Sequence, residues 1–500
     1  MDNEWVEKCW EKMCAKMEAQ CDRIGTEVPD TLVNGKHNDL MKEYPCAWAT
    51  GFWPGMLWLM YKETKKEKYR STAEKIEDML DEVLDIHYEK LIHDIGFQWS
   101  LTAVQNYKVT GNKRSRTRAL HAANLLAGRY NLRGKFIRAW NWDKTGWLLI
   151  QSLMNLPLLY WASIEIDDPR YDFIAIAHAD TTLKYLLRPD GSCHQIGIID
   201  SYNGKLLETP RGQGYAPGSS WSRGQSWGMY GFAMNYIHTG YHKYFEASLR
   251  IAHYVLDCLE KNDFVPLVDY KQPAEPQKID TSAGMIAASG LITLASIGNN
   301  PEKDFCLNGA MKILQKLEAE FVDWKANTDF IVHKAAKSYH SPEEEPHRPL
   351  IYGDYYFLEA LTKLRNPVKT EVTFIEQVQR NYVAVQSGDI DNKYMIKKEE
   401  LITWIEKHFN KESLSLRMAA DYFGFSEPYF SKIFKTIMGQ NFSNYLENIR
   451  MHHAQALLKQ HLKIEEVSHR CGYETSKTFR RAYKRYFGII PSRTYVIGSN

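Results

Sequence analysis

The sequence lacks several features that would define a secreted, membrane-bound or metal-binding protein. It has no run of 18 apolar residues, so we expect no membrane span. The first eight residues are rich in charge and lack the apolar stretch of a secretory signal. The eight cysteines are scattered, with no C-x-x-C spacing for zinc or redox chemistry. These absences predict a cytoplasmic protein with reduced thiols, no bound metal and no cofactor.

Charge is nearly balanced along the chain but unevenly distributed. The 500 residues carry a net charge of +2. Between residues 396 and 500, 17 Lys and Arg stand against 10 Asp and Glu, giving +7, whereas the preceding residues carry −5. A basic C-terminal region on a mildly acidic body predicts nucleic-acid contact at one end of the chain only.

Helical periodicity dominates residues 1–366. Long amphipathic runs recur near 116–130, 146–164, 220–237, 243–260, 281–297, 303–321 and 353–364. Evenly spaced helices without strand alternation predict an all-α barrel or toroid rather than an α/β fold. An Asn-Pro pair and mixed polar sequence predict a linker over 367–395, with a short helix near its middle at 374–385.

One short helical pattern occurs twice in the remaining residues, 396–500. Its offsets repeat after 48 residues, with Leu416, Ala420 and Gly424 matched by Ile464, Ser468 and Gly472. Each copy continues with a polar turn, an aromatic-rich helix bearing lysines or arginines, and a closing glycine. A helix, a tight turn and a second helix form the unit that enters a DNA groove. The duplication therefore predicts a domain with two helix-turn-helix units.

This region resembles the DNA-binding domain of the AraC/XylS family of transcriptional regulators. The matching segments are 416–426, 429–435, 445–458, 464–473 and 479–492. The resemblance implies binding to double-stranded DNA. Members of the family often dimerise, so a homodimer is an option here, although the sequence shows no coiled-coil seam.

Aromatic residues mark the buried face of the second helix in each unit. Phe430 and Phe434 are four residues apart, as are Phe479 and Tyr483, so each pair should face the core. The resemblance implies contacts to base edges from Ser431, Lys432, Lys477, Thr478 and Arg481. It implies phosphate contacts from Lys435, Lys484 and Arg485, with Arg480 exposed on the same face. The alternative is an ordinary solvated basic surface.

Residues 1–366 resemble the unsaturated glucuronyl hydrolases, family 88 of the glycoside hydrolases. The matching segments are 48–59, 93–97, 137–141, 154–163, 212–215, 221–231, 280–283 and 352–361. The resemblance implies an (α/α)6 barrel. These enzymes act on the C4=C5 double bond of the unsaturated uronate left by polysaccharide lyases. They hydrate that bond, and the resulting hemiketal opens to release the sugar.

The residue expected to perform this chemistry is replaced. In the family, one Asp donates a proton to the alkene and helps to activate water. The resemblance places that Asp at Gln151, four residues before Asn155. An amide cannot transfer protons in this way near neutral pH. Asp143 would lie about 12 Å away along a helix, so Asp94 is the only plausible residual carboxylate.

The sugar-binding residues implied by the resemblance are present. Trp53, Trp140 and Trp227 match positions that stack on sugar rings. His93, His194, Gln213 and Arg223 match polar contacts, and Arg223 suits a uronate carboxylate. Each feature also has a structural explanation. Any single tryptophan could serve barrel packing, the His93–Asp94 pair could cap a loop, and His194 could be a surface histidine. Their joint occurrence favours a sugar-binding cleft.

These features predict a DNA-binding transcriptional regulator whose barrel senses unsaturated uronyl oligosaccharides without turning them over. The first alternative is an active hydrolase fused to an AraC-type domain, using Asp94 or a network of bound water. The second is a DNA-binding protein whose barrel is a platform for protein interactions.

Overall fold

The computed structural model describes residues 3–298, 300–341, 347–367, 398–423, 427–438 and 440–494. The chain divides into two compact units, Met1–Gln379 and Arg380–Asn500, which are described separately. Apart from residue 367, the predicted linker over 367–395 and its short helix lie outside the described residues, so the domain boundaries stay predictions. Within the described residues, no helix combines the length and apolar character needed to cross a bilayer.

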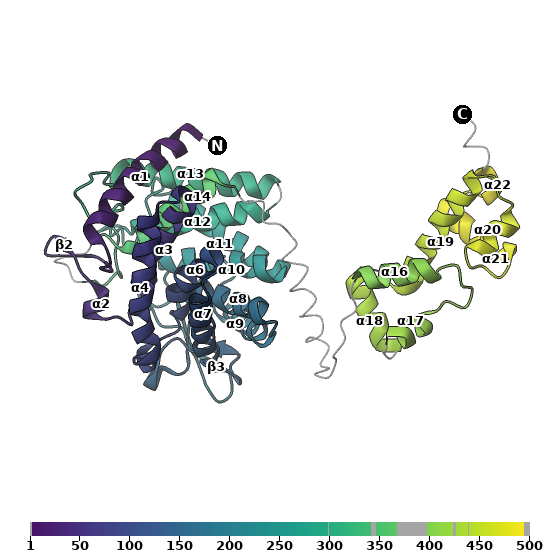
Figure 1. The fold of residues 1–500 in the computed structure, drawn as a ribbon, viewed down its shortest axis with the longest axis horizontal. Coiled ribbons are helices and arrows are strands. Elements are labelled where there is room, and N and C mark those ends of the chain that lie inside the picture. Colours follow the sequence, from purple (N-terminus) through teal and green to yellow (C-terminus); the bar gives the residue numbers. More distant parts are fainter. Residues whose placement is uncertain are drawn as a thin grey trace. The chain divides into compact units, whose positions relative to one another are not determined.

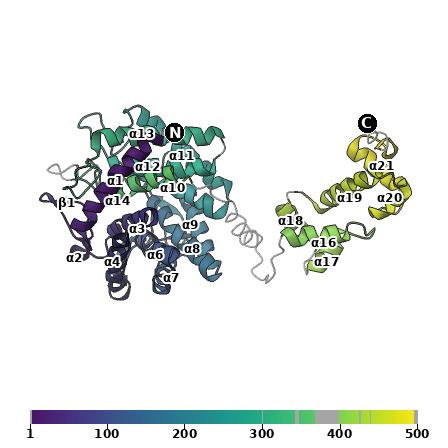
Figure 2. The same ribbon diagram turned by 45° about the horizontal axis from the view of Figure 1, so that its top comes forward.

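The N-terminal unit is a double ring of helices (Figures 1 and 2). The inner ring contains α3 (Phe52–Thr64), α5 (Ile95–Leu101) with α6 (Ala103–Thr110), α8 (Leu156–Ile166), α10 (Ser222–Thr239), α12 (Thr281–Ile297) and α14 (Ile351–Arg365). The outer ring contains α1 (Asn3–Ile24), α4 (Glu67–Asp85), α7 (Lys113–Ala127), α9 (Arg170–Leu186), α11 (His242–Glu260) and α13 (Asn300–Phe321). Packing of α14 against α3 closes the inner ring. This is the expected (α/α)6 barrel.

Sequence composition decides which ring a helix joins. Helix α12 is apolar or small on every face, and every residue from Thr281 to Ala295 is buried. Helix α11 buries a single stripe that includes Ile251, Val255 and Leu259. A helix that is apolar all round needs partners on every side, whereas a one-sided helix can face water. The same difference separates α10 from α4.

Short antiparallel sheets, which an all-α prediction omits, lie in the loops between the helices. Strands β1 (Leu32–Val33) and β2 (Lys36–His37) form one hairpin, and β3 (Tyr130–Asn131) and β4 (Phe136–Ile137) form another. A third sheet has the order β5 (Trp147–Leu149), β6 (Ile196–Ile199) and β7 (Leu206–Glu208). Strands of two to four residues are too short to give a recognisable alternation.

The helical run predicted over 146–164 is wrong in its first half. Strand β5 occupies its start, followed by the 3-10 turn η4 (Ile150–Asn155), and α8 begins only at Leu156. Pro157 occupies the first turn of α8, where its missing N–H has no helical acceptor to lose. Gln151 therefore stands in a loop-like turn that precedes an inner helix.

The C-terminal unit contains two small helical cores. The first involves α16 (Lys398–His408), α17 (Leu416–Phe423), α18 (Glu427–Met438) and the start of α19 (Phe442–Lys459). The second involves the end of α19, α20 (Ile464–Arg470) and α21 (Ser476–Phe487), followed by α22 (Pro491–Thr494). Phe430, Phe434, Phe479 and Tyr483 are fully buried, which confirms the predicted inward faces. Helix α19 contributes to both cores.

Close packing between α5 and η4 predicts a sensitive glycine. A Cβ on Gly96 would lie 2.6 Å from the Asn155 carbonyl oxygen and would also meet the Asn155 backbone. We expect Gly96→Ala to lower the free energy of unfolding by about 1–3 kcal/mol, as overpacking does. In the control Gly353→Ala, the new Cβ meets nothing closer than 3.5 Å. Urea denaturation would compare the two, and equal stability would contradict the packing.

Candidate functional site

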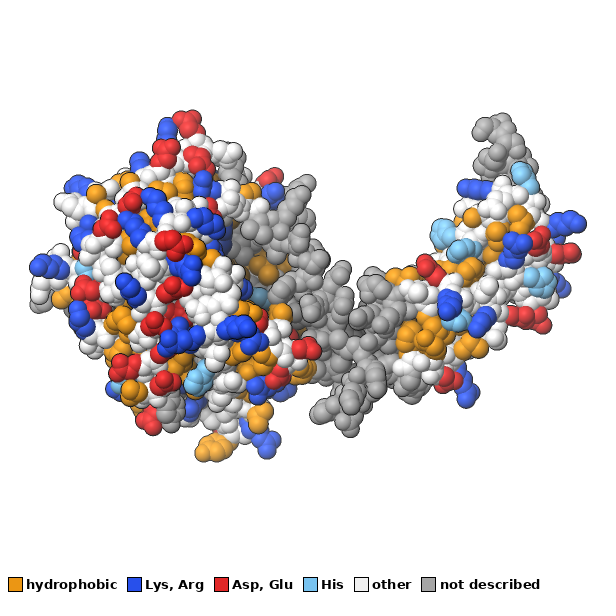
Figure 3. Space-filling model, viewed as in Figure 1, with side chains coloured by type: hydrophobic (Ala, Val, Ile, Leu, Met, Phe, Trp, Pro, Cys, Tyr) orange, Lys and Arg blue, Asp and Glu red, His pale blue; other side chains and the backbone are white. Residues whose placement is uncertain are grey.

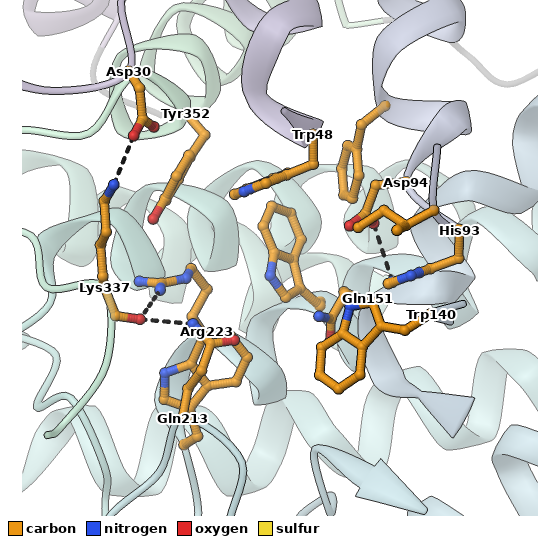
Figure 4. A pocket seen from close by; sticks show the side chains of 14 residues that line it. Asp30, Trp48, His93, Asp94, Trp140, Gln151, Gln213, Arg223, Lys337 and Tyr352 are labelled. Carbon is orange, nitrogen blue, oxygen red and sulfur yellow. Dashed lines mark hydrogen bonds and ion pairs between the residues drawn. The ribbon is translucent and has the colours of Figure 1, made fainter. Parts of the chain in front are cut away.

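A cavity of about 220 Å³ lies where the inner helices begin. Its lining comes from segments far apart in the sequence, among them Trp48 before α3, Asp94 before α5, Gln151 in η4, Arg223 in α10 and Tyr352 in α14. Figure 4 shows aromatic and polar side chains converging on this space. Trp140, Gln213 and Trp227, all predicted from the sequence, also line the cavity, as does His93.

Asp94 and His93 form a buried polar pair at one side of the cavity (Figure 4). His93 Nε2 lies 3.2 Å from Asp94 Oδ1. The His93 Nδ1–H donates to the Ala139 carbonyl oxygen at 3.0 Å, because that oxygen can only accept. Burial lowers the pKa of His93, and burial raises the pKa of Asp94 against the opposing effects of His93 and Asn155. The neutral form of each side chain is therefore favoured.

Gln151 presents a hydrogen-bond acceptor that lacks a partner. Its Oε1 atom is buried and accepts no hydrogen bond from the described residues. A buried carbonyl without a donor costs free energy that a ligand hydroxyl can recover. The backbone oxygen of Gln151 accepts from Asn155 Nδ2 at 3.4 Å, which ties this turn to the start of α8.

Arg223 lines the cavity, but its guanidinium is hydrogen-bonded to other residues of the protein. Its Nη1 donates to Asp280, which is fully buried, and to the Ala336 carbonyl oxygen at 2.8 Å. Its Nη2 donates to the Lys337 carbonyl oxygen at 2.7 Å. The guanidinium also lies 4.7 Å from the centre of the Trp221 ring. Asp280 therefore balances the charge of this guanidinium within the protein.

A second cation faces the cavity and was missed from the sequence. Lys337 Nζ pairs with Asp30 at 2.7 Å, and the Lys337 side chain is 49% exposed. Both lie across the cavity from Gln151 and Asp94 (Figure 4). Nothing in the local sequence marks either residue, because the chain brings them together from positions 307 apart. Trp48, Trp221 and Tyr352 also line the cavity, and all three stand within the segments that carried the resemblance.

Two predicted binding residues do not line this cavity. Trp53 is fully buried, and its indole N–H donates to the Gly25 carbonyl oxygen at 3.1 Å. Trp53 is therefore not placed to stack on a sugar in this cavity, which Trp48 at the start of the same segment lines instead. His194 is partly buried, and its backbone N–H bonds to Leu186. Asp143 is exposed and does not line the cavity either.

The predicted DNA-contacting residues lie on α18 and α21. Ser431 is partly exposed and Lys435 exposed, whereas the Lys432 side chain lies outside the described residues. On α21 the predicted residues are all exposed: Lys477, Thr478, Arg480, Arg481, Lys484 and Arg485. Thr475 caps this helix by accepting from the Thr478 N–H, and Arg485 pairs with Glu447 of α19. Figure 3 shows basic side chains, with acidic ones among them, over this part of the unit.

A closed double ring of helices, an aromatic cavity where its inner helices begin and a pair of helix-turn-helix units define the class: an (α/α)6 barrel joined to a DNA-binding domain. A family model described as Glycosyl Hydrolase Family 88 matches residues 20–259, and one described as Helix-turn-helix domain matches residues 419–495. The unsaturated glucuronyl hydrolase of Bacillus sp. (strain GL1) is 36% identical over 337 residues, covering 64% of this chain and 87% of that protein.

Solved structures agree with this relationship. The crystal structure of the enzyme from Bacillus sp. GL1 matches with a TM-score of 0.68 and 31% identity, covering 73% of this chain and 98% of that one. An aspartate-to-asparagine variant of the Streptococcus agalactiae enzyme, complexed with dGlcA-GalNAc6S, matches with a TM-score of 0.62 and 25% identity, covering 73% and 92%. The chain belongs to the unsaturated glucuronyl hydrolase family, with an AraC-type helix-turn-helix domain fused at its C-terminal end.

The two cations beside the cavity should respond differently to substitution. Arg223→Met leaves Asp280 buried without its counter-charge, so we expect a loss of about 3–5 kcal/mol in stability. Lys337→Met removes a half-exposed ammonium from Asp30, whose side chain is 12% exposed, and we expect a smaller loss of about 1 kcal/mol. Chemical denaturation measures both. Equal effects would show that Arg223 is not the structural cation of this site.

Proposed function

We propose that this chain is a one-component transcriptional regulator. Its barrel binds an unsaturated uronyl oligosaccharide without hydrating it, and the bound state alters how the helix-turn-helix units engage double-stranded DNA. The observation that carries the proposal is Gln151, an unpartnered amide in the cavity at the position where the resemblance places the proton-transferring Asp. The fusion of a family 88 barrel with a DNA-binding domain supplies the context.

The two carboxylates that line the described cavity are both engaged by other residues. Among the described residues, Asp30 and Asp94 are the acidic side chains that line it. Asp30 is paired with Lys337 on the opposite side (Figure 4). Asp94 accepts from Asn155 Nδ2 at 3.1 Å and lies against His93. General acid–base catalysis contributes a factor of roughly 10²–10⁴ to the rate. Replacing the Asp with an amide therefore removes a large part of the expected rate enhancement.

The remaining groups suit a uronyl sugar. The half-exposed Lys337 ammonium is a cation for the carboxylate, and the guanidinium of Arg223 lines the same cavity. Gln151 Oε1 offers an acceptor to a ring hydroxyl. Trp140, whose ring centre lies 4.9 Å from that of Trp147, offers an apolar face to a pyranose ring. The Streptococcus agalactiae complex supports this reading, since an amide in place of an aspartate accompanies a bound disaccharide there.

An active hydrolase is the second candidate, and one observation favours it. Asp94 lines the cavity, and burial raises the pKa of its carboxyl group. A protonated carboxyl group is the species that would donate to the alkene. The contacts to His93 and Asn155 already engage the carboxyl group. Among the described residues that line the cavity, the other acid is Asp30, on the opposite side (Figure 4).

Binding and turnover of an unsaturated uronyl disaccharide separate these candidates. For the regulator, calorimetric titration of the full chain shows saturable binding, and the double bond persists during incubation. Loss of the double bond supports the hydrolase. Absence of both binding and turnover leaves the barrel as a protein-interaction platform and contradicts the proposal.

Restoring the acid tests why turnover is absent. We expect Gln151→Asp to gain measurable hydration of the disaccharide, by a factor of at least about 10² over the wild type. Gln151→Glu is the matched control, because it restores a carboxyl group displaced by one methylene. The ultraviolet absorbance of the C4=C5 bond follows the reaction. If Gln151→Asp binds the disaccharide and stays inactive, the replaced acid does not explain the lost chemistry.

At the other end of the chain, Arg481 is expected to read sequence. It is exposed near the middle of α21. Arg481→Ala should weaken operator binding by about 1–3 kcal/mol while changing binding to random DNA less. Lys484→Ala, the matched control one turn further on, should weaken both alike. Equal losses for operator and random DNA in Arg481→Ala would make it a phosphate contact.

A further inference from the structure

The barrel contains a second cavity where its inner helices end. It has a volume of about 200 Å³ and is lined by one face of α3, by the α5–α6 junction and by the last turns of α14. Tyr352 of α14 lines the first cavity and Lys363, eleven residues later, lines the second. At 1.5 Å per residue, about 16 Å of helix separates these two residues. Tyr355, three residues after Tyr352, also lines the second cavity, so the cavities approach each other along α14, while Lys62 and Lys363 lie towards the far ends of their helices.

A buried acidic and basic pair at this second cavity is already satisfied. Glu359 Oε2 accepts from Tyr230 at 3.0 Å and from Lys363 Nζ at 2.9 Å, while its Oε1 accepts from Tyr355. Lys363 Nζ also donates to Ser289 Oγ and Thr293 Oγ1, both at 2.9 Å. The three hydrogens of the Lys363 ammonium are thus used within the protein, and both oxygens of the Glu359 carboxylate accept hydrogen bonds. Neither group is left to hold a cation or an anion alone.

The groups left over at this cavity are hydrogen-bond donors. Trp58 is fully buried, lines the cavity, and its indole N–H meets no acceptor among the described residues. Lys62, one helical turn later, lies on the same face of α3 and donates to Gln105. An ammonium has three hydrogens, so Lys62 retains donors for a ligand. The cavity carries one more positive than negative charge, from Lys62, Lys363 and Glu359.

We propose that this second cavity binds a small anion, a sulfate-, phosphate- or carboxylate-sized group held by the Trp58 indole N–H and the Lys62 ammonium. An oxyanion supplies the acceptors that both donors lack and neutralises the excess charge. The site is separate from the uronyl cavity and does not depend on the proposed function. Its ligand contacts Thr362 and Lys363, in the last turn of α14, the final described helix before the DNA-binding unit.

Protonation of Lys62 gives this site a pH dependence. Burial, together with the charge of Lys108, lowers the pKa of Lys62 to about 8. The charged groups that act on it are Glu359 of α14, Lys108 of α6, Glu63 of α3 and Lys65, which follows α3. Lys363 of α14 lines the same cavity. Anion binding needs the protonated form, so affinity should be greatest below pH 8 and fall above it. Sulfate is the probe of choice, because its own charge is constant over this range.

Titration of the full chain with sodium sulfate, against sodium chloride at matched ionic strength, tests the site. We expect saturable binding at pH 7 and at least about tenfold weaker binding in Lys62→Met. Trp58→Phe keeps the ring and removes the N–H, and should weaken binding severalfold. The control Lys75→Met removes an exposed lysine of α4 and should bind as the wild type does. Raising the pH from 7 to 9.5 should weaken binding by the wild type.

Sulfate affinities that are equal in the wild type and Lys62→Met, or no saturable binding at all, would overturn the proposal. Sodium phosphate and sodium acetate, titrated in the same way, show which oxyanion the cavity prefers. Binding of an unsaturated disaccharide should be the same in Lys62→Met as in the wild type, since Lys62 does not line the uronyl cavity. The anion site and the proposed sugar site are therefore tested independently of each other.

Discussion

The side-chain amide of Asn155 joins the two chain segments that carry Asp94 and Gln151 into the first cavity. Its Oδ1 accepts from the Phe97 N–H at 2.8 Å, and its Nδ2 donates to Asp94 Oδ1 at 3.1 Å and to the Gln151 carbonyl oxygen. Gly96 allows this approach, because a Cβ there would meet the Asn155 backbone. A single amide thus fixes the start of α5 against η4, and with it the separation of Asp94 from Gln151.

In the proposed regulator, this arrangement keeps a binding site and lacks one of the two groups of a proton-transfer system. Asp94 remains buried against His93, and both favour their neutral forms. Gln151 supplies a hydrogen-bond acceptor but no exchangeable acid. Across the cavity, Lys337 and Arg223 keep positive charge close to where a carboxylate would lie. Recognition of a sugar depends on shape, stacking and charge, and replacing a carboxylate with an amide leaves these largely unchanged. Hydration of an alkene, in contrast, requires a proton donor.

Much of the fold followed from the sequence, because helical periodicity and the repeated unit are local signals. Phe430 and Phe434 could be assigned to the core from their spacing alone, and the structure confirms it. The cavity was harder to predict. Trp53 stands in a segment that resembles sugar-binding relatives, yet it packs inward, and Trp48 lines the cavity instead. Lys337 and Asp30 carry no local signal, because their pairing depends on ring closure by α14. The small sheets were missed because their strands are so short.

The account depends on the loss of proton transfer at Gln151, and single-turnover kinetics test that loss most directly. The full chain, in molar excess over an unsaturated uronyl disaccharide, is incubated while the absorbance of the C4=C5 bond is followed. We expect the bound disaccharide to keep its C4=C5 double bond over many hours. Decay of the absorbance in the wild type, abolished by Asp94→Asn, would contradict it and show that Asp94 sustains catalysis.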